Sequence, residues 1–578
     1  MRYDTDRLVF SPSDLVVFLD SEFASWMDRW RIECSKNPEG MTVPVGINHE
    51  GLSCTPDEQD AESRLIATMG MSHEAAFLQQ LLDKGHGVED IKTVADDGQL
   101  KATIEAMRNG MEFIYQGRLK HRHFEGFADF LVQLPGDSSL GEHHYEVLDT
   151  KLARSVKPYF IIQLCSYSEM LESIQGRLPT NFSVVLGNGD HAKLNVQKFL
   201  YYFRSLQRSF LNFHDEFTPE GFPHPGLTSS HGRWSSFATE LLEAEDHLCQ
   251  VANITRTQMK KLEAAGIVTL TDLSKTRKKH VPRIAQPVFE RLKIQARLQV
   301  QSRQKEKPLY EFGPPDIDNS RRGMALLPPP SSNDVYFDIE GFPLVTDGLE
   351  YLLGAVCFEK GNLKFLDWWA HDQQQERQAF EEFIDWVYAR WKADPSMHIY
   401  HYASYEVSAM RRLMGKHATR EREVDDLLRN QVFVDLYTVV RQGLIIGTTG
   451  YSLKDIECLY MEKRGGEITT AGGSVVAYNS WIESGQSQDW QKSPLLKEIR
   501  HYNQVDCEST WGLFAIVCHC LHPLFLQPVH HRPDIVERML VGGSSVSLVV
   551  SDFRLEIVVI GFLSQSSKHL HPCRLLHE

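Results

Sequence analysis

The sequence lacks the patterns that mark several large classes of protein. Its ten cysteines include no Cys-x-x-Cys pair, which argues against a zinc ribbon or a four-cysteine iron–sulfur site. No run of about 18 uncharged apolar residues predicts a membrane-spanning helix. The N-terminus is charged and lacks the apolar core of a signal peptide. We therefore expect a cytoplasmic protein with no membrane segment, and scattered cysteines of this kind are typical of a reducing compartment.

An excess of positive charge is also missing. The formal net charge is −16, which excludes a surface that is basic throughout but is compatible with a local basic groove beside acidic metal sites. No Gly-x-x-x-x-Gly-Lys-Ser/Thr loop is present, so we expect no nucleotide-driven motor in this chain. No repeat of solenoid period is found. What remains is a hydrophobic content of 42% and a charged content of 24%, as in ordinary globular proteins.

The chain has 578 residues, which predicts two or three domains. Connections rich in proline and glycine indicate the boundaries. We expect an α/β domain over residues 1–215, a small helical connector over 235–307, and a second α/β domain over 333–520. Residues 521–578 form a tail of unclear structure, because its histidines and β-like run do not fit the helix expected to close the second domain.

Acidic residues in the first domain are spaced like a nuclease site. Asp149 and Lys151 are two apart in a strand-like run, so their side chains share one face. Asp129 lies in a preceding strand-like run, and a turn at residues 135–137 (Pro-Gly-Asp) would form a hairpin that brings it close to Asp149. Carboxylates can hold the divalent cation that activates water for phosphodiester cleavage, and a lysine can stabilise the transition state.

A helix after this hairpin adds two polar side chains. Gln163 and Tyr167 are four residues apart and share a helix face. An Asp-x-Lys tripeptide alone is usually a solvated surface pair, but the ordered set is more specific. Over roughly residues 1–210 the sequence resembles the RecB-like branch of the PD-(D/E)XK nucleases. The resemblance implies that Asp129 and Asp149 bind metal, that Lys151 is catalytic, and that Gln163 and Tyr167 shape the site and contact DNA.

The same family takes one more ligand from an upstream helix. His73 and Glu74 fit that position and lie about 100° apart on a helix, so only one can face the metal. We favour His73, and the alternative is that either residue is an exposed helix position. Some RecB-like nucleases carry an iron–sulfur cluster near this site. The downstream cysteine group that such a cluster needs is missing, so we expect none here.

A second acidic constellation lies in the other α/β domain. Apolar and polar residues alternate from Val335 to Glu340, which predicts a half-buried strand with Asp338 and Glu340 on one face. Far downstream, Tyr502 and Asp506 are four apart on a predicted helix and share a face. Asp-x-Glu alone would be an ordinary solvated strand face, but the ordered set is more specific.

This second set resembles the tyrosine-bearing DEDD exonucleases of the ribonuclease H-like fold. The resemblance implies that the carboxylates hold two Mg²⁺ or Mn²⁺ ions and that Tyr502 orients the attacking water. The family needs a further acid, and Glu406 occupies the expected region where most relatives use aspartate. The longer side chain leaves the activity of this domain open. Asp435 is another acidic candidate.

The connector contains a helix, a glycine turn at Gly266 and a second helix, similar to a helix-hairpin-helix unit whose turn amides can hold a DNA phosphate. A basic stretch follows. Its residues could bind the nucleic-acid backbone between the two sites, or they could belong to a solvated helical spacer. The candidates for DNA contact are Lys275, Arg277, Lys278 and Lys279.

The order of the three parts resembles a group of bacterial RecB-family nucleases. The resemblance implies a metal-dependent nuclease that acts on DNA at ends or single-stranded regions. In some relatives a helicase follows, so a helicase on another chain is an expected partner. Two alternatives stay open, namely a nucleic-acid-binding scaffold with one or both nuclease folds inactive, and an exonuclease that processes RNA.

Overall fold

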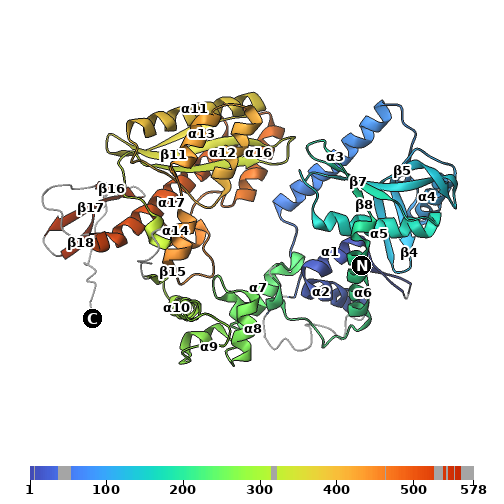
Figure 1. The fold of residues 1–578 in the computed structure, drawn as a ribbon, viewed down its shortest axis with the longest axis horizontal. Coiled ribbons are helices and arrows are strands. Elements are labelled where there is room, and N and C mark those ends of the chain that lie inside the picture. The colour runs from blue at the N-terminus through green and yellow to red at the C-terminus, as the bar shows by residue number, and fades with distance from the viewer. Residues whose placement is uncertain are drawn as a thin grey trace.

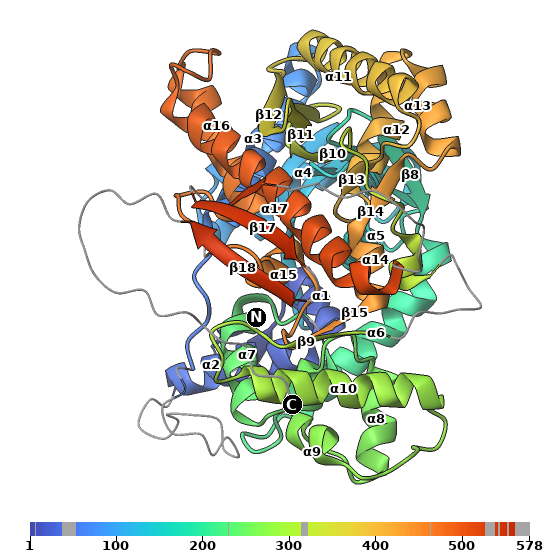
Figure 2. The same cartoon turned by 90° about the vertical axis from the view of Figure 1, so that its left-hand side faces the viewer.

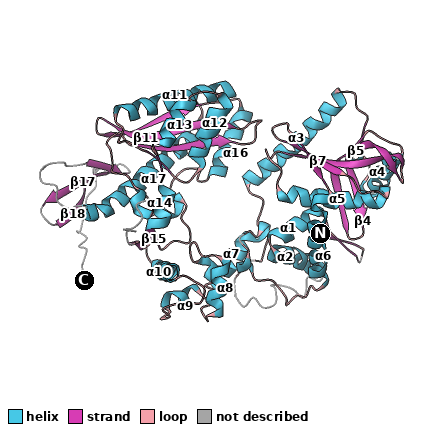
Figure 3. Ribbon diagram, viewed as in Figure 1, coloured by secondary structure: helices cyan, strands magenta, loops and turns pink. Residues whose placement is uncertain are grey.

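The computed structural model of the protein is a mixed α/β structure (Figures 1 to 3). It describes residues 1–5, 7–36, 52, 54–228, 230–313, 322–462, 464–525, 538–541, 544–551 and 554–560, with side chains as far as Cys518. None of the helices within these ranges has the length and apolar character needed to cross a membrane.

The first domain is built on a six-stranded sheet in the order β3-β4-β5-β6-β7-β8. Its strands are β3 (Val88–Asp90), β4 (Phe113–His121), β5 (Phe124–Ser138), β6 (Gly141–Lys151), β7 (Asn181–Leu186) and β8 (His191–Asn195). β6 and β7 are parallel and are joined by α5 (Pro158–Gln175), whereas β5 and β6 form an antiparallel hairpin. The hairpin aligns the strand that carries Asp129 with the strand that carries Asp149.

Helices cover both faces of this sheet. α1 (Pro12–Asp20), α5 and α6 (Gln197–Asp215) pack on one face around a core that contains Leu15, Val147 and Phe203. On the other face, α3 (Ala61–Asp83) packs through Phe77 against Leu148 and its neighbours. The remaining elements are β1 (Arg2–Asp4), β2 (Arg7–Val9), α2 (Glu22–Lys36) and α4 (Gln99–Arg108).

The turn of the β5–β6 hairpin differs from the sequence prediction. Ser138 pairs with Gly141, so the turn consists of the two residues between them, and Pro135 pairs with His143 inside the ladder. The predicted turn at residues 135–137 is therefore wrong. These residues form a bulge, since the register shifts between Pro135 and Ser138 and Gly136 has φ +132°. A Pro-Gly pair indicates an interruption of regular strand pairing, and either a bulge or a turn can be that interruption.

The connector is helical, with a core of its own that includes Leu262, Ile267 and Leu273. Gly266 has φ +76° between α8 and α9, a conformation that favours glycine, so the predicted helix, glycine turn and helix are present. Thr255 and Thr269 each begin a helix with a capping box. The helices are α7 (Ser235–Ala244), α8 (Arg256–Ala264), α9 (Leu270–Lys275) and α10 (Gln286–Ser302).

The second domain has a five-stranded sheet in the order β12-β11-β10-β13-β14. β10 is antiparallel to β11 and parallel to β13. Its strands are β10 (Val335–Phe342), β11 (Leu349–Glu359), β12 (Asn362–Trp369), β13 (Ile399–His401) and β14 (Phe433–Asp435). A separate two-stranded sheet pairs β9 (Tyr310–Phe312) with β15 (Leu444–Ile446).

Both faces of this sheet are covered. α11 (Gln373–Ala393), α12 (Tyr405–His417) and α13 (Glu421–Arg429) pack on the face of Phe337, and α17 (Pro494–Phe525) packs on the face of Tyr336. The other helices are α14 (Leu436–Gly443), α15 (Leu453–Glu457) and α16 (Ala471–Ser484). The predicted half-buried strand is therefore a central strand with two covered faces, and Glu340 is buried. Alternation alone cannot reveal this, because the polar face is the one that holds the acidic site.

The two α/β domains touch where α3 meets α16 (Figure 1). Glu62 on α3 lies against Gly472 on α16, where a Cβ atom would stand 1.8 Å from the Glu62 carboxylate. After α17 the chain forms an antiparallel sheet of β16 (Arg538–Val541), β17 (Ser544–Ser551) and β18 (Arg554–Ile560). The histidine side chains of the tail lie outside the described residues.

Candidate active sites

An acidic cluster lies in the second domain between β10 and α17. Asp338, Glu340 and Asp506 each offer a carboxylate oxygen, and these oxygens lie within 4.8 Å of one another. Within the part of the chain that the structure describes, no other group of three or more His, Cys, Asp or Glu side chains gathers so closely. Asp338 and Asp506 are 168 positions apart in the sequence. The structure places them next to each other, as the sequence analysis predicted.

A glycine on the neighbouring strand allows α17 to approach this cluster. Gly354 on β11 pairs with Asp338, and a Cβ atom there would stand 1.7 Å from Oδ1 of Asn503. Asn503 donates through Nδ2 to Oδ2 of Asp338 at 2.8 Å. The thiol of Cys507 donates to the carbonyl oxygen of Gly354 at 3.3 Å. The helix is thus held against the strands by residues on both sides of Asp506.

Burial raises the pKa of each acid in the cluster, and like charges add to the shift for Asp338 and Glu340. Burial, with Asp506, Glu340 and Glu406 nearby, raises the pKa of Asp338 well above its usual range. Burial and Asp506 raise the pKa of Glu340 to about 8. Burial also raises the pKa of Asp506, although Arg464 and a hydrogen bond from Tyr502 oppose the shift. Oxygen donors that carry excess negative charge suit a hard divalent cation, so the donor set fits Mg²⁺ or Mn²⁺.

Glu406 approaches the cluster from α12 without joining it. It is buried near the start of the helix, and its Oε2 lies 3.3 Å from Nδ1 of His401. Its charge contributes to the raised pKa of Asp338. The other candidate, Asp435, stabilises the local backbone instead. It caps α14 and accepts hydrogen bonds from the backbone N–H groups of Tyr437 and Ala403.

Two basic side chains that the sequence analysis did not identify border this site. Arg464 pairs with Oδ1 of Asp506 at 2.7 Å and also with Glu457. The Lys454 ammonium lies 5.6 Å from the centre of the Tyr502 ring. Arg464 lies in a glycine-containing loop with no helical or strand pattern, so no local signal links it to Asp506. Tyr502 itself is buried, and burial together with Asp506 raises its pKa above the usual range.

In the first domain Asp129, Asp149 and Lys151 come together. Nζ of Lys151 lies 2.7 Å from Oδ2 of Asp149. Asp129 accepts hydrogen bonds from the backbone N–H of Thr150 at 3.0 Å and from its hydroxyl at 3.2 Å. Burial and the adjacent Asp149 raise the pKa of Asp129 well above its usual range. Burial lowers the pKa of Lys151, but Asp149 and Asp129 outweigh that effect and raise it. The lysine is therefore a cation beside an acid pair.

The helix residues predicted for this site lie on α5. Burial raises the pKa of Tyr167, and the nearby charges of Asp149 and Asp129 raise it further. Gly126 lets α5 approach the strand, since a Cβ atom there would stand 3.0 Å from the Tyr167 ring. Gln163 donates to the Ser13 hydroxyl at 3.3 Å, which links α5 to the start of α1.

On α3, Glu74 is the residue that interacts with the first site. Its charge helps to raise the pKa of Lys151, and its Oε1 accepts a hydrogen bond from Gln116 at 2.5 Å. Gln116 has φ +53° within β4, and this irregularity directs its side chain toward α3. The Nε2 atom of His73 is buried and makes no hydrogen bond. The contacts favour Glu74 over His73 as the side chain that faces Lys151.

The basic stretch of the connector divides into two parts. Arg291 donates to the carbonyl oxygens of Arg441, Gln442 and Leu444, so it fastens α10 to the second domain. Arg297 pairs with Glu311. In contrast, a group of exposed cations makes no ion pair with any described residue. This group consists of Lys275, Arg277, Lys278 and Lys279.

Residues 335–518 match the family model described as RNase_H superfamily. The match contains Asp338, Glu340, Glu406, Tyr502 and Asp506, so the chain carries a ribonuclease H-like domain, as the sequence predicted. Proteins of this superfamily generally hydrolyse phosphodiester bonds. No curated protein matches the chain.

Proposed function

We propose that the protein is a metal-dependent nuclease that hydrolyses phosphodiester bonds in DNA, at ends or in single-stranded regions. The observation that carries the proposal is the cluster of Asp338, Glu340 and Asp506 inside the ribonuclease H-like domain. These residues would hold Mg²⁺ or Mn²⁺. When bound, such an ion supplies an activated water and neutralises charge that develops on the phosphate.

The protein's own groups around the cluster suit that chemistry. The hydroxyl of Tyr502 lies beside Asp506 and can orient a water molecule between the acids and the substrate. Asn503 holds Asp338 in a fixed orientation. Lys454 and Arg464 bring positive charge to the edge of the site, where it would attract a phosphate and stabilise an anionic transition state.

We propose the first domain as a second active site, of the RecB-like PD-(D/E)XK type. Two adjacent carboxylates and an ion-paired lysine on neighbouring strands support this assignment. Asp129 and Asp149 would hold the metal, with Glu74 or His73 as the third ligand. Lys151 would stabilise charge on the phosphate, while Gln163 and Tyr167 would contact the strand from α5. Gly266 and the exposed cations of the connector would bind the backbone without reading its sequence.

The test is cleavage of labelled single-stranded DNA, duplex DNA and RNA by the full chain with Mg²⁺, with Mn²⁺ and with chelator. We expect cleavage of DNA that stops when the cation is removed. With the second site disabled, Asp149→Ala and Lys151→Ala should each lower the remaining rate at least about a hundredfold, since each removes a contribution worth ~3 kcal/mol. With the first site disabled, Asp338→Ala and Asp506→Ala should do the same.

Each other outcome selects an alternative. Preference for RNA would favour the RNA-processing exonuclease. Binding without cleavage under every cation would favour the scaffold with inactive folds. If all cleavage survives Asp338→Ala and Asp506→Ala, the ribonuclease H-like domain is a binding module and the first domain carries the activity.

A further inference from the structure

An arginine from the loop that follows the first site reaches the second domain. Arg154 lies three positions after Lys151, between β6 and α5. A Cβ atom at Gly348, just before β11, would stand 1.5 Å from Nη2 of Arg154. Gly348 also has φ +59°, so both its conformation and this close approach favour glycine. The guanidinium therefore rests directly on the backbone of the second domain.

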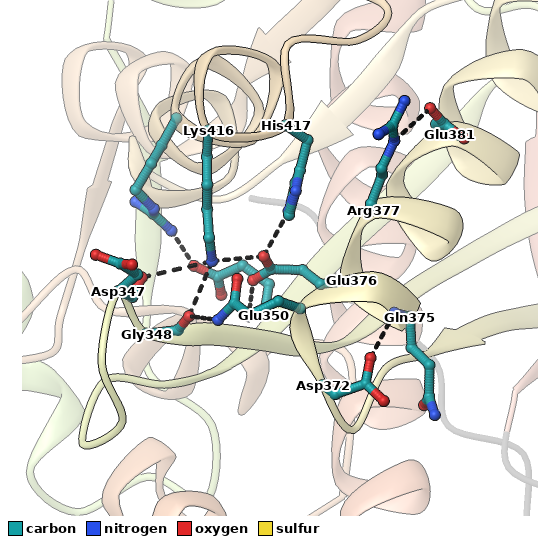
Figure 4. A network of polar contacts seen from close by, with 12 residues as sticks. Asp347, Gly348, Glu350, Asp372, Gln375, Glu376, Arg377, Glu381, Lys416 and His417 are labelled. Atoms are coloured by element: carbon teal, nitrogen blue, oxygen red, sulfur yellow. Dashed lines mark hydrogen bonds and ion pairs between the residues drawn. The ribbon is translucent and has the colours of Figure 1, made fainter.

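The loop that receives Arg154 is held in place by a partly buried network of polar contacts (Figure 4). Lys416 and Gln373 both donate to the carbonyl oxygen of Gly348 at 2.9 Å. Lys416 also pairs with Glu376, which is buried and accepts the backbone N–H of Glu350 at 2.6 Å. Because α11, α12 and β11 all share these contacts, the loop presents a fixed surface to the first domain.

The Arg154 guanidinium has no counter-ion among the described residues. It is exposed, and it makes no hydrogen bond or ion pair with any residue in the described part of the chain. Its neighbour is another cation, Arg412 on α12, whose pKa is lowered by burial and by Arg154. Arg412 in turn is bound to Glu350. Two guanidinium groups close enough to repel each other, one of them unpaired among the described residues, attract an anion, and arginine suits a phosphate in particular.

Tyr405 lies within electrostatic reach of both Arg154 and the acidic cluster. Burial raises the pKa of Tyr405 to about 12, with Glu340 and Asp338 adding to the shift and Arg154 opposing it. All of these groups are thus its electrostatic neighbours. Its hydroxyl donates to Oε2 of Glu350 at 3.0 Å, which fixes the ring. The residue is nevertheless 47% exposed, so part of it is open to contact with a base.

Arg154 lies close to the first site along the chain. Arg154 is three positions after Lys151, so their Cα atoms lie at most ~11 Å apart. Arg154 also lies within electrostatic reach of Tyr405, which precedes Glu406. A short stretch of one nucleic-acid strand could therefore run from the first acid pair to the second cluster.

We propose that Arg154, Arg412 and Tyr405 form a strand-binding position at the junction of the two domains. The guanidinium groups bind a backbone phosphate and the Tyr405 ring stacks on the adjacent base. One single strand is thereby presented to both acidic sites. This proposal rests on the proposed nuclease function and adds that the two sites share a substrate strand.

Binding can be tested without cleavage. Fluorescence anisotropy would follow a labelled oligothymidylate on the full chain in chelator, across a range of salt concentrations. Arg154→Ala should weaken binding about tenfold, as expected for a charge-assisted hydrogen bond. It should also flatten the slope of log affinity against log salt by roughly 0.7, the value for one phosphate contact on a single strand. Arg108→Ala, an exposed arginine on α4 that makes no ion pair with a described residue, is the matched control and should change neither quantity.

Tyr405 supplies a second arm of the binding test. Tyr405→Leu should weaken binding about tenfold through loss of stacking, whereas Tyr405→Phe keeps the ring and should bind like the wild type. Melting curves would verify that each variant folds. If Arg154→Ala and Tyr405→Leu both leave affinity and salt slope unchanged, no strand occupies the junction and the proposal is wrong.

Cleavage then decides whether the strand is shared. In an Asp338→Asn background, where the first site acts alone, and in an Asp149→Asn background, where the second acts alone, Arg154→Ala should raise KM about tenfold with little change in kcat. A rise in KM at one site only would mean that Arg154 serves that site and would overturn the shared strand. Absence of cleavage by the wild type would refute the proposed function, whereas the anisotropy result would still decide whether the junction binds a strand.

Discussion

Asn503 donates a hydrogen bond of 2.8 Å to Asp338, and the residue that makes room for it is Gly354. Any side chain at position 354 would overlap the amide oxygen of Asn503, which lies 1.7 Å from the place of a Cβ atom. The position of α17, and with it the positions of Tyr502 and Asp506, thus depends on the absence of a side chain on the neighbouring strand. The geometry of the acidic cluster is a consequence of this packing.

The first prediction concerns this contact. Gly354→Ala should displace Asn503, break its hydrogen bond to Asp338 and lower the activity of the second site about tenfold or more. It should also destabilise the protein by ~1–3 kcal/mol, the cost of overpacking. Gly415→Ala is the control, because a Cβ atom on this exposed position of α12 would meet nothing within 4 Å. It should leave activity unchanged and raise stability by up to ~1 kcal/mol. Equal activity in both variants would contradict the proposed role of Gly354.

The second prediction links metal, pH and stability. The folded state raises the pKa of Glu340 to about 8, so between roughly pH 4 and pH 8 it keeps a proton that the unfolded chain has released. The folded state then binds more protons than the unfolded state, and stability in chelator should fall as the pH rises through this window. A divalent cation replaces the proton, so it should stabilise the protein more at pH 8 than at pH 6.

Thermal melting measures this effect. Saturating Mg²⁺ or Mn²⁺ at about 100 times its Kd should contribute ~2.7 kcal/mol at the higher pH. The double variant Asp338→Asn, Glu340→Gln should lose the contribution of this cluster and much of the pH dependence, while any metal effect from Asp129 and Asp149 remains. The same metal-induced shift in the wild type and in this variant would show that the cluster does not bind the cation.

Glu406 is the subject of the third prediction. It is buried beside His401 and acts on Asp338 electrostatically, but it lies outside the group of three acids. If it helps to hold or orient the metal, Glu406→Gln, which keeps the volume, should lower the activity of the second site about ten- to a hundredfold. The variant should fold, since the amide retains a hydrogen-bond acceptor. A wild-type rate with the first site disabled would remove Glu406 from the site.

The sequence predicted best where the signal is local. Asp338 and Glu340 share a strand face and Tyr502 and Asp506 share a helix face, so short patterns were sufficient to find them and to identify the fold of this domain. Gly354, Asn503 and Arg464 meet the acids only through tertiary packing, and no spacing rule connects position 354 with position 503. The mistaken turn at 135–137 has a similar cause, because a bulge and a turn use the same residues. The roles of the site residues in both domains stay predictions.

The last prediction separates binding from architecture within the basic stretch. Arg277, Lys278 and Lys279 are exposed and make no ion pair with a described residue, whereas Arg291 caps the end of α14 through three carbonyl oxygens. Replacing the first three with alanine should weaken binding to all DNA sequences alike. Each phosphate contact that is lost reduces the amount of condensed counterion released when DNA binds. The slope of log affinity against log salt should flatten by up to roughly 0.7 for each contact on a single strand.

Comparison with Arg291→Ala makes the result specific. The triple variant should melt like the wild type and cleave at the wild-type rate when substrate is saturating, since Asp149 and Asp338 are untouched. Arg291→Ala should lower stability by ~1 kcal/mol, because it removes three hydrogen bonds, of which the one to Leu444 is partly buried. It should leave the salt slope nearly unchanged. An unchanged slope in the triple variant would identify the stretch as a solvated spacer, and the strand must then follow another face between the two domains.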